Sequence, residues 1–270
     1  MSKSSPAVSQ LFTSAVQNGN VSQLAAQALN IPDLGAQIQE GLGVAPDDVR
    51  AQEVTLVTTL VDDSGSIRFA GNSQLVRDGH NGMVAALKGS KQAGGVLMHT
   101  RYLNGTVLYP YSLLDQVPQM DSHNYDPNGG TPLYDQTALI LGTVLAKYQE
   151  MEEAGTAARS VTVIVTDGMD EGSRVHTADS VRKVVNDMLA RERHIIGAIG
   201  IQYTDSRTGQ AFDFREVFRE MGLQDRWILT PENDHSAIRR AFNFMSQSAV
   251  RASQGGAQFS KTAAGGFVTP

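Results

Sequence analysis

Three side chains with oxygen atoms follow one apolar segment of the sequence. Asp62, Ser64 and Ser66 stand at alternate positions directly after the apolar and β-branched residues 54–61. Carboxylate and hydroxyl oxygens are the ligands that hard cations prefer, whereas zinc sites in proteins usually include cysteine or histidine. Because the chain has no cysteine and its six histidines lie far apart, we expect this segment to bind Mg²⁺, Mn²⁺ or Ca²⁺.

Two more residues with oxygen-bearing side chains lie in predicted loops, one just before a helix and one just after a strand. Thr131 lies in the Gly-Gly-Thr-Pro segment at 129–132, and Asp167 follows the apolar residues 161–166. Open α/β sheets bind their ligands at the carboxyl ends of parallel strands. We therefore expect Thr131 and Asp167 to complete the metal site.

The spacing Asp62-x-Ser64-x-Ser66, followed by Thr131 and then by Asp167, resembles the metal-ion-dependent adhesion site of von Willebrand factor A-type (VWA) domains. The resemblance covers about residues 54–248. It implies that Ser64 and Ser66 bind the metal through their hydroxyls, and that Asp62 and Asp167 lie close to it, partly through water. It also implies that Thr131 coordinates directly in one state and through water in another, and that an acidic side chain of a partner takes the sixth position.

Two segments, 129–135 and 166–171, look most like the intracellular bacterial and phage members of this family, such as those of tellurium-resistance operons. This narrower resemblance implies a cytoplasmic protein of a stress or defence operon. The implied partner is a protein with an exposed Glu or Asp, such as an AAA+ ATPase or another protein encoded in the operon.

The first motif, taken alone, could also be an ordinary turn. Asp, Ser and Gly are common turn residues because their side chains bond to the nearby backbone, so Asp-x-Ser-x-Ser alone indicates no more than a turn. Three such segments in order, each following a strand pattern, favour a metal site instead. Asp63 and Asp170 add nearby charge. In a strand Asp63 would point away from Asp62, which leaves a solvated or second-layer carboxylate as the alternative to a functional one.

Composition limits the classes of function. With 270 residues, 41% of them hydrophobic, the chain can form one α/β domain with extensions. The net charge of -6, without a cluster of Lys and Arg, argues against binding to nucleic acid. No segment approaches the ~18 consecutive apolar residues of a membrane span, and the N-terminus lacks the apolar segment of a signal peptide. We therefore expect a cytoplasmic protein without membrane contact.

The chain divides into three zones. Residues 1–51 have apolar positions at helical spacing and predict a helical N-terminal extension of two or three short helices. The resemblance implies that residues 52–250 form a VWA-type domain. Residues 251–270 are rich in Ser, Gln, Gly and Ala, which predicts a flexible C-terminal tail because such a composition buries little apolar surface.

Within 52–250, strands and helices alternate, which predicts a doubly wound α/β fold with helices on both faces of a mostly parallel sheet. The Asn104-Gly105 pair predicts a type I′ hairpin and hence one antiparallel edge strand in a six-stranded sheet. The expected strands are 54–61, 96–103, 106–109, 161–166, 194–201 and 227–229. The expected helices are 74–87, 132–152, 178–191, 215–221 and 236–249.

Phosphotransferases of the haloacid-dehalogenase type offer an enzymatic alternative. They too place an aspartate after the first strand, a Ser or Thr later and an acidic pair that holds Mg²⁺, which here would be Asp62, Thr131 and Asp167 with Asp170. Their general acid is a second aspartate two residues after the nucleophile, and that position is Ser64. We therefore expect no enzyme, but a cation-dependent protein-binding or scaffolding module. A purely structural metal site in a larger assembly is the other alternative.

Overall fold

The structure is a computed structural model that describes residues 8–29, 32–202 and 214–267. Its centre is a six-stranded sheet in the order β3-β2-β1-β4-β5-β6. All neighbouring strands pair in parallel except β2 and β3, which are antiparallel. The strands are β1 (Glu53–Val61), β2 (Val96–Tyr102), β3 (Val107–Leu113), β4 (Ala157–Thr166), β5 (His194–Gly200) and β6 (Ile228–Leu229). The predicted fold class is confirmed.

Strand β1 lies inside the sheet between β2 and β4, with Val57 opposite Met98 on one side and Val161 on the other. Eight of its nine residues are buried. A strand covered on both faces needs apolar or β-branched side chains at every position, which is why residues 54–61 form one continuous run. This position places the residue after Val61 in the middle of the carboxyl edge of the sheet.

The β2–β3 hairpin forms as expected, but its turn is of a different type. Gly105 has a φ of 92°, whereas Asn104 is not among the described residues with positive φ. A type I′ turn requires positive φ at both central residues. Here Tyr102 donates its N–H to the carbonyl oxygen of Thr106 at 2.9 Å, which closes a three-residue loop with glycine in the left-handed position. The prediction of a type I′ turn is therefore wrong, although the antiparallel edge strand is confirmed.

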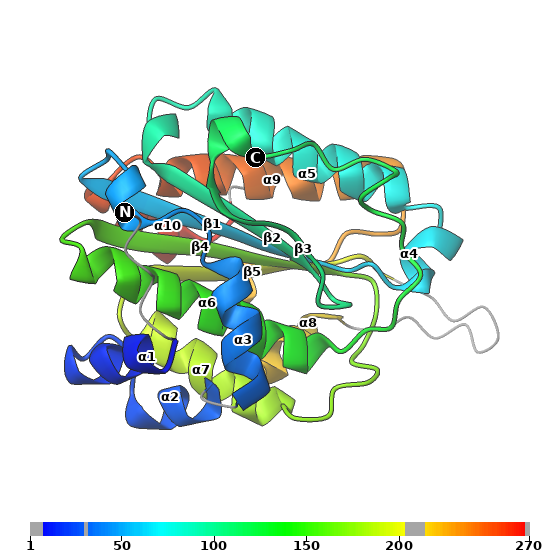
Figure 1. Cartoon of the computed structure of the whole chain (residues 1–270). Coiled ribbons are helices and arrows are strands. Elements are labelled where there is room, and N and C mark those ends of the chain that lie inside the picture. Colours follow the sequence, from blue (N-terminus) through cyan, green and yellow to red (C-terminus); the bar gives the residue numbers. More distant parts are fainter. Residues whose placement is uncertain (1–7, 30–31, 203–213, 268–270) are drawn as a thin grey trace.

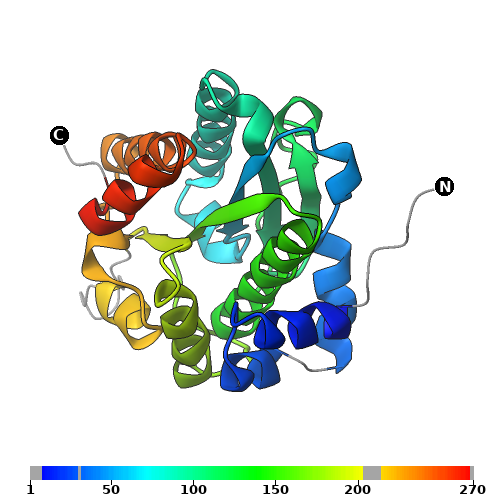
Figure 2. The ribbon, with the colours of Figure 1, turned by 90° about the vertical axis from the view of Figure 1, so that its left-hand side faces the viewer.

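Helices cover both faces of the sheet, as Figures 1 and 2 show. One face carries α5 (Ser73–Lys88), α9 (His235–Ala252) and α10 (Gly256–Gly265), which share one apolar core with it. The other face carries α6 (Leu133–Glu153), α7 (Ala178–Leu189) and α8 (Phe214–Glu220). The short helix α4 (Gly65–Phe69) lies beyond the end of β1 and belongs to neither layer.

The N-terminal residues form the expected short helices, α1 (Val8–Gln17), α2 (Gln23–Leu29) and α3 (Pro32–Gly41). Helices α1 and α3 pack on α6, whereas α2 packs mainly on α7, and all three share the apolar core on this face. A Cβ atom on Gly142 of α6 would lie 2.8 Å from Cδ1 of Ile38, so this glycine permits the close approach of α3. As a result α6 is buried on nearly all sides, with the sheet on one side and the N-terminal helices on the other.

A buried arginine ties α3 to the sheet. The side chain of Arg101 on β2 is fully buried. It donates hydrogen bonds to the carbonyl oxygens of Gln37 at 2.8 Å and Gly105 at 2.7 Å, and lies 3.6 Å from Glu40. A buried guanidinium needs such partners, because an unpaired charge in the interior costs several kcal/mol. The first helices therefore supply part of the interior of the domain.

The prediction of a flexible tail after residue 251 is wrong for the described part of that segment. It contains the end of α9 and then α10, and Phe259 and Phe267 are both buried. The Phe267 ring meets Trp227 edge-on at 5.0 Å between centroids. The composition was misleading because two aromatic side chains can bury a large apolar area even in a segment that is otherwise small and polar. Among the described residues, no helix is long and apolar enough to cross a membrane.

The C-terminal packing gives a first test. Phe259 is 1% exposed. The Cζ atom of Arg159 lies over its ring, 5.6 Å from the ring centroid. We expect Phe259→Ala to lower the free energy of unfolding by about 3–5 kcal/mol, the range for large-to-small core changes. Urea denaturation followed by circular dichroism would measure the loss.

The matched control is Phe69→Ala, because Phe69 is 88% exposed. Its effect on the free energy of unfolding should stay within about 0.5 kcal/mol. Equal midpoints and slopes for wild type and Phe259→Ala would show that α10 does not contribute to the folded core.

Candidate metal centre

The candidate metal centre begins where β1 ends. Asp62 continues the pairing of the strand by donating its N–H to the carbonyl oxygen of Val165 at 2.9 Å. The side chain is fully buried. Its carboxylate accepts hydrogen bonds from the Ser64 N–H at 2.8 Å, the Thr166 hydroxyl at 2.5 Å and the Asp167 N–H at 3.4 Å. One carboxylate thus holds together the loops that follow β1 and β4.

Hydroxyl groups extend this cluster toward the surface. The Oγ atoms of Ser64 and Ser66 lie 2.8 Å apart, and the Ser66 hydroxyl donates to Oδ1 of Asp167 at 2.6 Å. Ser64 directly precedes helix α4, and Ser66 lies in its first turn. The structure therefore brings together four of the five residues that the sequence singled out, through a continuous set of hydrogen bonds.

Thr131, in the segment 129–132, lies at the same edge of the sheet. Gly65 donates its N–H to the carbonyl oxygen of Gly129 at 3.2 Å, and Glu171 donates its N–H to the carbonyl oxygen of Thr131 at 2.7 Å. A Cβ atom on Gly168 would lie 3.2 Å from Oγ1 of Thr131. Glycine at 168 therefore lets the buried threonine side chain lie directly beside the residue that follows Asp167, so all five predicted residues meet at one edge of the sheet.

The carboxylates are crowded and poorly solvated. Burial raises the pKa of Asp62, and burial together with the charge of Asp62 raises the pKa of Asp167 to about 7. Burial also raises the pKa of Asp63 to about 6, with a smaller contribution from Asp62. A divalent cation among these groups would favour their charged forms, because opposite charge offsets both desolvation and repulsion.

The donor set consists of oxygen atoms and fits a divalent cation. No group of three His, Cys, Asp or Glu side chains in the described ranges is placed to hold a metal ion. A cation at this edge would therefore depend on hydroxyl oxygens of Ser64, Ser66 and Thr131, with carboxylates of Asp62 and Asp167. Oxygen-only sets of this kind suit Mg²⁺, Mn²⁺ and Ca²⁺.

Asp63 is neither solvated nor a direct part of the cluster. It is buried, and its carboxylate accepts the N–H of Asn104 at 3.0 Å. Its backbone carbonyl oxygen accepts the N–H groups of Asn128 at 2.8 Å and Gly129 at 2.9 Å. Of the alternatives that the sequence left open for Asp63, the solvated carboxylate is therefore excluded. Asp63 instead joins the β1 loop to the β2–β3 turn and to the segment that carries Thr131.

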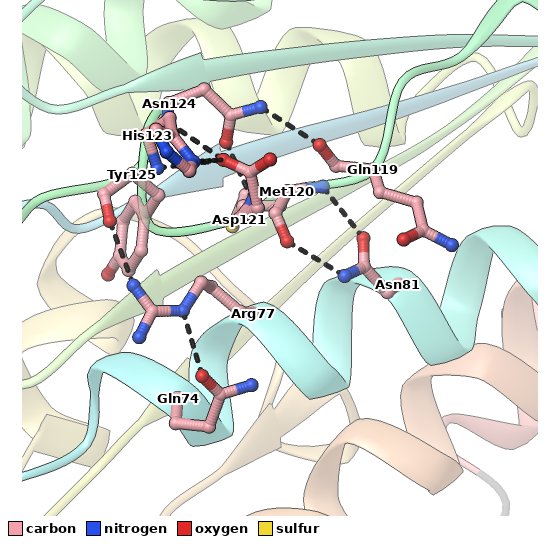
Figure 3. A network of polar contacts seen from close by, with 9 residues as sticks. All are labelled: Gln74, Arg77, Asn81, Gln119, Met120, Asp121, His123, Asn124 and Tyr125. Carbon is pink, nitrogen blue, oxygen red and sulfur yellow. Dashed lines mark hydrogen bonds and ion pairs between the residues drawn. The ribbon is translucent and has the colours of Figure 1, made fainter.

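A tyrosine that the sequence did not single out supports Asp62 from the other side. The buried hydroxyl of Tyr125 donates to the backbone carbonyl oxygen of Asp62 at 2.5 Å. The loop that carries Tyr125 is fastened to α5, as Figure 3 shows: Arg77 donates to the carbonyl oxygen of Tyr125 at 3.1 Å, and Asn81 makes two hydrogen bonds of 2.9 Å with the main chain of Met120. No spacing signal in the sequence connects residue 125 with residue 62.

The remaining turn of this loop is held by its own side chains. Asp121 accepts the N–H groups of His123 at 2.8 Å and Asn124 at 3.1 Å, and Asn124 in turn donates to the carbonyl oxygen of Gln119 at 2.9 Å. Arg77 also donates to the side chain of Gln74 at 3.2 Å. These hydrogen bonds connect the turn of the loop on the outer side of the site.

Two acidic residues cross-link the segments that carry Thr131 and Asp167. Asp170 accepts the N–H of Tyr134 at 3.0 Å in the first turn of α6. In the reverse direction, Asp135 accepts three backbone N–H groups, those of Arg174 at 2.8 Å, Val175 at 3.1 Å and His176 at 2.7 Å. The only signal for these cross-links in the sequence is an acidic residue at or near the end of each of the segments 129–135 and 166–171.

Comparisons with known proteins bear on the fold. No protein-family model matches the sequence, and a search of the curated proteins gives no match either. Among solved structures, the chain is similar to the pilus adhesin SpaC from Lactobacillus rhamnosus GG in its open conformation, with a TM-score of 0.52 and 14% identity over 74% of this chain and 30% of that chain. It is also similar to proximal thread matrix protein 1 from the mussel byssus, with a TM-score of 0.50 and 16% identity over 73% of this chain and 48% of that chain.

The chain therefore spans less than half the length of either of these proteins. Similarity at this level of identity concerns the fold alone. The six-stranded sheet with one antiparallel edge, and the loops at its carboxyl edge, give this chain the VWA-type fold that the motif spacing implied.

Proposed function

We propose that this chain binds a divalent cation at Asp62, Ser64, Ser66, Thr131 and Asp167 and uses it to hold an acidic side chain of a protein partner. The observation that carries the proposal is the set of hydrogen bonds from Ser64 to Ser66 and on to Asp167 beside the buried carboxylate of Asp62. Hydroxyl oxygens that face one another across hydrogen-bond distance can turn together toward a cation. The bonds that they give up are replaced by bonds to the metal.

The chemistry of these ligands accounts for a role in recognition. Serine and threonine hydroxyls are neutral, so a cation held mainly by them keeps much of its charge. A carboxylate of a partner would then bind to a cation whose positive charge the ligands of this chain have not neutralised. Asp62, fully buried and already bonded to three donors, orients the hydroxyl-bearing loop.

The surface beside the site supports a protein as the partner. The described residues include four strongly exposed large hydrophobic side chains, and three of them lie in the segments that follow β1 and β4 at this edge of the sheet. These are Phe69, at the end of α4, and Met169 and Val175, in the loop after β4, with exposures of 88%, 48% and 60%. Apolar side chains gathered beside a polar site are typical of protein interfaces.

The resemblance of the motifs adds narrower parts to the proposal. They are a cytoplasmic setting, an origin among bacterial or phage proteins of stress and defence operons, and an AAA+ ATPase or operon-encoded protein as the partner. These parts depend on residues 129–135 and 166–171 alone and stay predictions.

Metal binding is tested first. We expect wild-type protein to bind Mg²⁺ and Mn²⁺ in calorimetric titrations, and Ser66→Ala to lower the affinity by roughly tenfold or more, as losses close to a metal commonly do. Ser66 is suited to the test because it is only half-buried, so its replacement should leave the fold intact. Circular dichroism checks the fold, and Ser9→Ala on the exposed side of α1 is the control. Equal affinity for Ser66→Ala and Ser9→Ala would contradict the site.

Partner chemistry is tested without a known partner. A library of random displayed peptides is selected on the protein in Mg²⁺ or Mn²⁺ and eluted with EDTA. We expect the eluted peptides to share a Glu or Asp, because the open position of the cation needs an anionic ligand. Thr131→Ala should lose affinity for these peptides more than for the metal.

The apolar rim has its own control in the same experiment. Phe69→Ala should weaken peptide binding by about tenfold, the size of a moderate interface contact. Leu24→Ala removes a side chain that is 73% exposed on the distant helix α2 and should change nothing. Peptides that lack acidic residues or that stay bound in EDTA would mean that the metal is structural.

The absence of phosphotransfer is the last prediction from this site. Because residue 64 is a serine, whose hydroxyl is no general acid near neutral pH, we expect no turnover of p-nitrophenyl phosphate in Mg²⁺ above a blank. Ser64→Asp should not create activity, since Ser64 contacts Ser66 rather than an open pocket. Turnover by wild type that disappears in Asp62→Asn would overturn the binding-module proposal.

A further inference from the structure

A cavity of about 290 Å³ lies at the amino edge of the sheet, opposite the metal centre. Its walls come from the end of α7, the start of β5, the turn before β6 and helix α10, at the edge that Figure 2 faces. The seven residues of β5 separate the two edges by about 20 Å, at ~3.3 Å for each residue. The volume lies at the lower end of the range for ligand pockets, ~300–1,000 Å³. The cavity shares no residue with the metal centre.

Arg226 brings to this cavity a guanidinium that is held in place but has no anion. The residue is exposed, and it donates hydrogen bonds from Nη1 to the carbonyl oxygen of Ala264 at 3.2 Å and from Nη2 to Oε1 of Gln224 at 2.6 Å. Ala264 and Gln224 both line the cavity, so these bonds place the guanidinium at its wall. An arginine has five N–H donors, and the other three have no partner in the described chain. An oriented guanidinium with open donors suits a carboxylate.

Glu192 lines the same cavity with an unpaired carboxylate. The residue is exposed, and within the described ranges its side chain has no hydrogen bond or ion pair, not even with Arg226. Its φ of 54° makes it the only non-glycine residue of the described chain with a left-handed backbone. That conformation favours glycine, and side chains held in it are concentrated at functional sites. The cavity thus has one open anion and one open cation.

The rest of the cavity is apolar or already bonded. Leu189, Ile195 and Ala263 supply apolar surface. Nδ1 of the buried His194 lies 2.8 Å from the Ser160 hydroxyl, and burial lowers the pKa of this histidine to about 3, so it adds no charge. At ~30 Å³ for each water molecule the cavity has room for about ten, which is also the size of a molecule such as leucine. A ligand that satisfies these walls has a carboxylate, a cationic group and a small apolar body.

We propose that this cavity binds a free α-amino acid with an apolar side chain. The carboxylate of the amino acid pairs with Arg226, and its ammonium group, which has three donors and no acceptor, pairs with Glu192. Its side chain contacts Leu189 and Ile195. The ligand supplies each charge of the cavity with the opposite charge that the chain itself does not provide. The proposal uses no ligand of the metal centre and stands apart from the proposed function.

Trp227 gives a direct readout, because it lines the cavity and is the only tryptophan in the chain. Its indole N–H donates to the carbonyl oxygen of Ala263 at 3.3 Å. The full chain, labelled with ¹⁵N and kept in EDTA so that no metal takes part, is titrated with L-leucine. We expect a saturable change in the fluorescence of Trp227 and in the position of its indole ¹H–¹⁵N signal.

Analogues of leucine test each part of the ligand. N-acetyl-L-leucine keeps the carboxylate but has no ammonium group, and L-leucinamide keeps the ammonium group but has no carboxylate. Each should bind at least tenfold more weakly than L-leucine, because one charge of the cavity is left without a partner. Glycine should also bind at least tenfold more weakly, since it has no apolar side chain to bury. Equal affinity for N-acetyl-L-leucine and L-leucine would overturn the proposal, because the site would then need a carboxylate alone.

Variants separate binding from folding. Glu192→Gln and Arg226→Gln each remove one charge and should weaken the binding of L-leucine by about tenfold or more. Glu192→Gly should weaken it as much, yet keep the midpoint of urea denaturation at or above that of wild type, because glycine fits a φ of 54°. Arg239→Gln, on the exposed side of α9, is the control and should bind as wild type does.

Two further results would contradict the proposal. One is the absence of a saturable change with L-leucine, L-methionine and L-phenylalanine. The other is wild-type affinity for L-leucine in both Glu192→Gln and Arg226→Gln, which would show that neither charge of the cavity holds the ligand.

Discussion

The carboxylate of Asp62 is the group on which the functional edge of this molecule depends. It is fully buried at the end of a central strand, where an anion without donors would be strongly unfavourable. Its donors come from both loops that meet there, the N–H groups of Ser64 and Asp167 and the hydroxyl of Thr166. The need to satisfy one anion therefore fixes the path of two loops. These loops present Ser66 and Asp167 to each other across 2.6 Å.

Around this carboxylate the structure adds supports that come from every neighbouring segment. Asp63 joins the β2–β3 turn to the segment before Thr131, and Tyr125 donates a hydrogen bond to the backbone of Asp62. Asp135 accepts backbone N–H groups of the loop after β4, and Asp170 of that loop accepts a backbone N–H group at the start of α6. Each support uses a side chain to satisfy backbone groups of a loop. A metal site on loops needs such bonds, because its ligands must keep their positions without a regular element to hold them. The edge is thus cross-linked by hydrogen bonds where the hydroxyls converge, and apolar where Phe69 and Met169 reach solvent.

The sequence predicted those features that depend on local pattern. Continuous apolar runs marked the buried strands, and alternating oxygen-bearing residues after 54–61 marked the site, because both signals lie within a few residues. The exact turn at Asn104-Gly105 could not be predicted, since it depends on where β2 and β3 stop pairing. The role of Tyr125 was missed for a related reason, because its contact with Asp62 joins residues 63 positions apart. The packing of the C-terminal segment depends on two phenylalanines that find room beside Trp227 and Arg159, which composition cannot show.

The buried arginine on β2 has a consequence for how such domains can diverge. Arg101 keeps its charge in the interior because α3 offers the carbonyl oxygen of Gln37 and the carboxylate of Glu40. A descendant that lost the first three helices would take away two of the three partners of this guanidinium. The arginine could then persist only if the same loss opened it to water, because a charge that stays buried without partners is strongly unfavourable. A homologue without the N-terminal helices is therefore expected either to expose this position to solvent or to have an uncharged residue there.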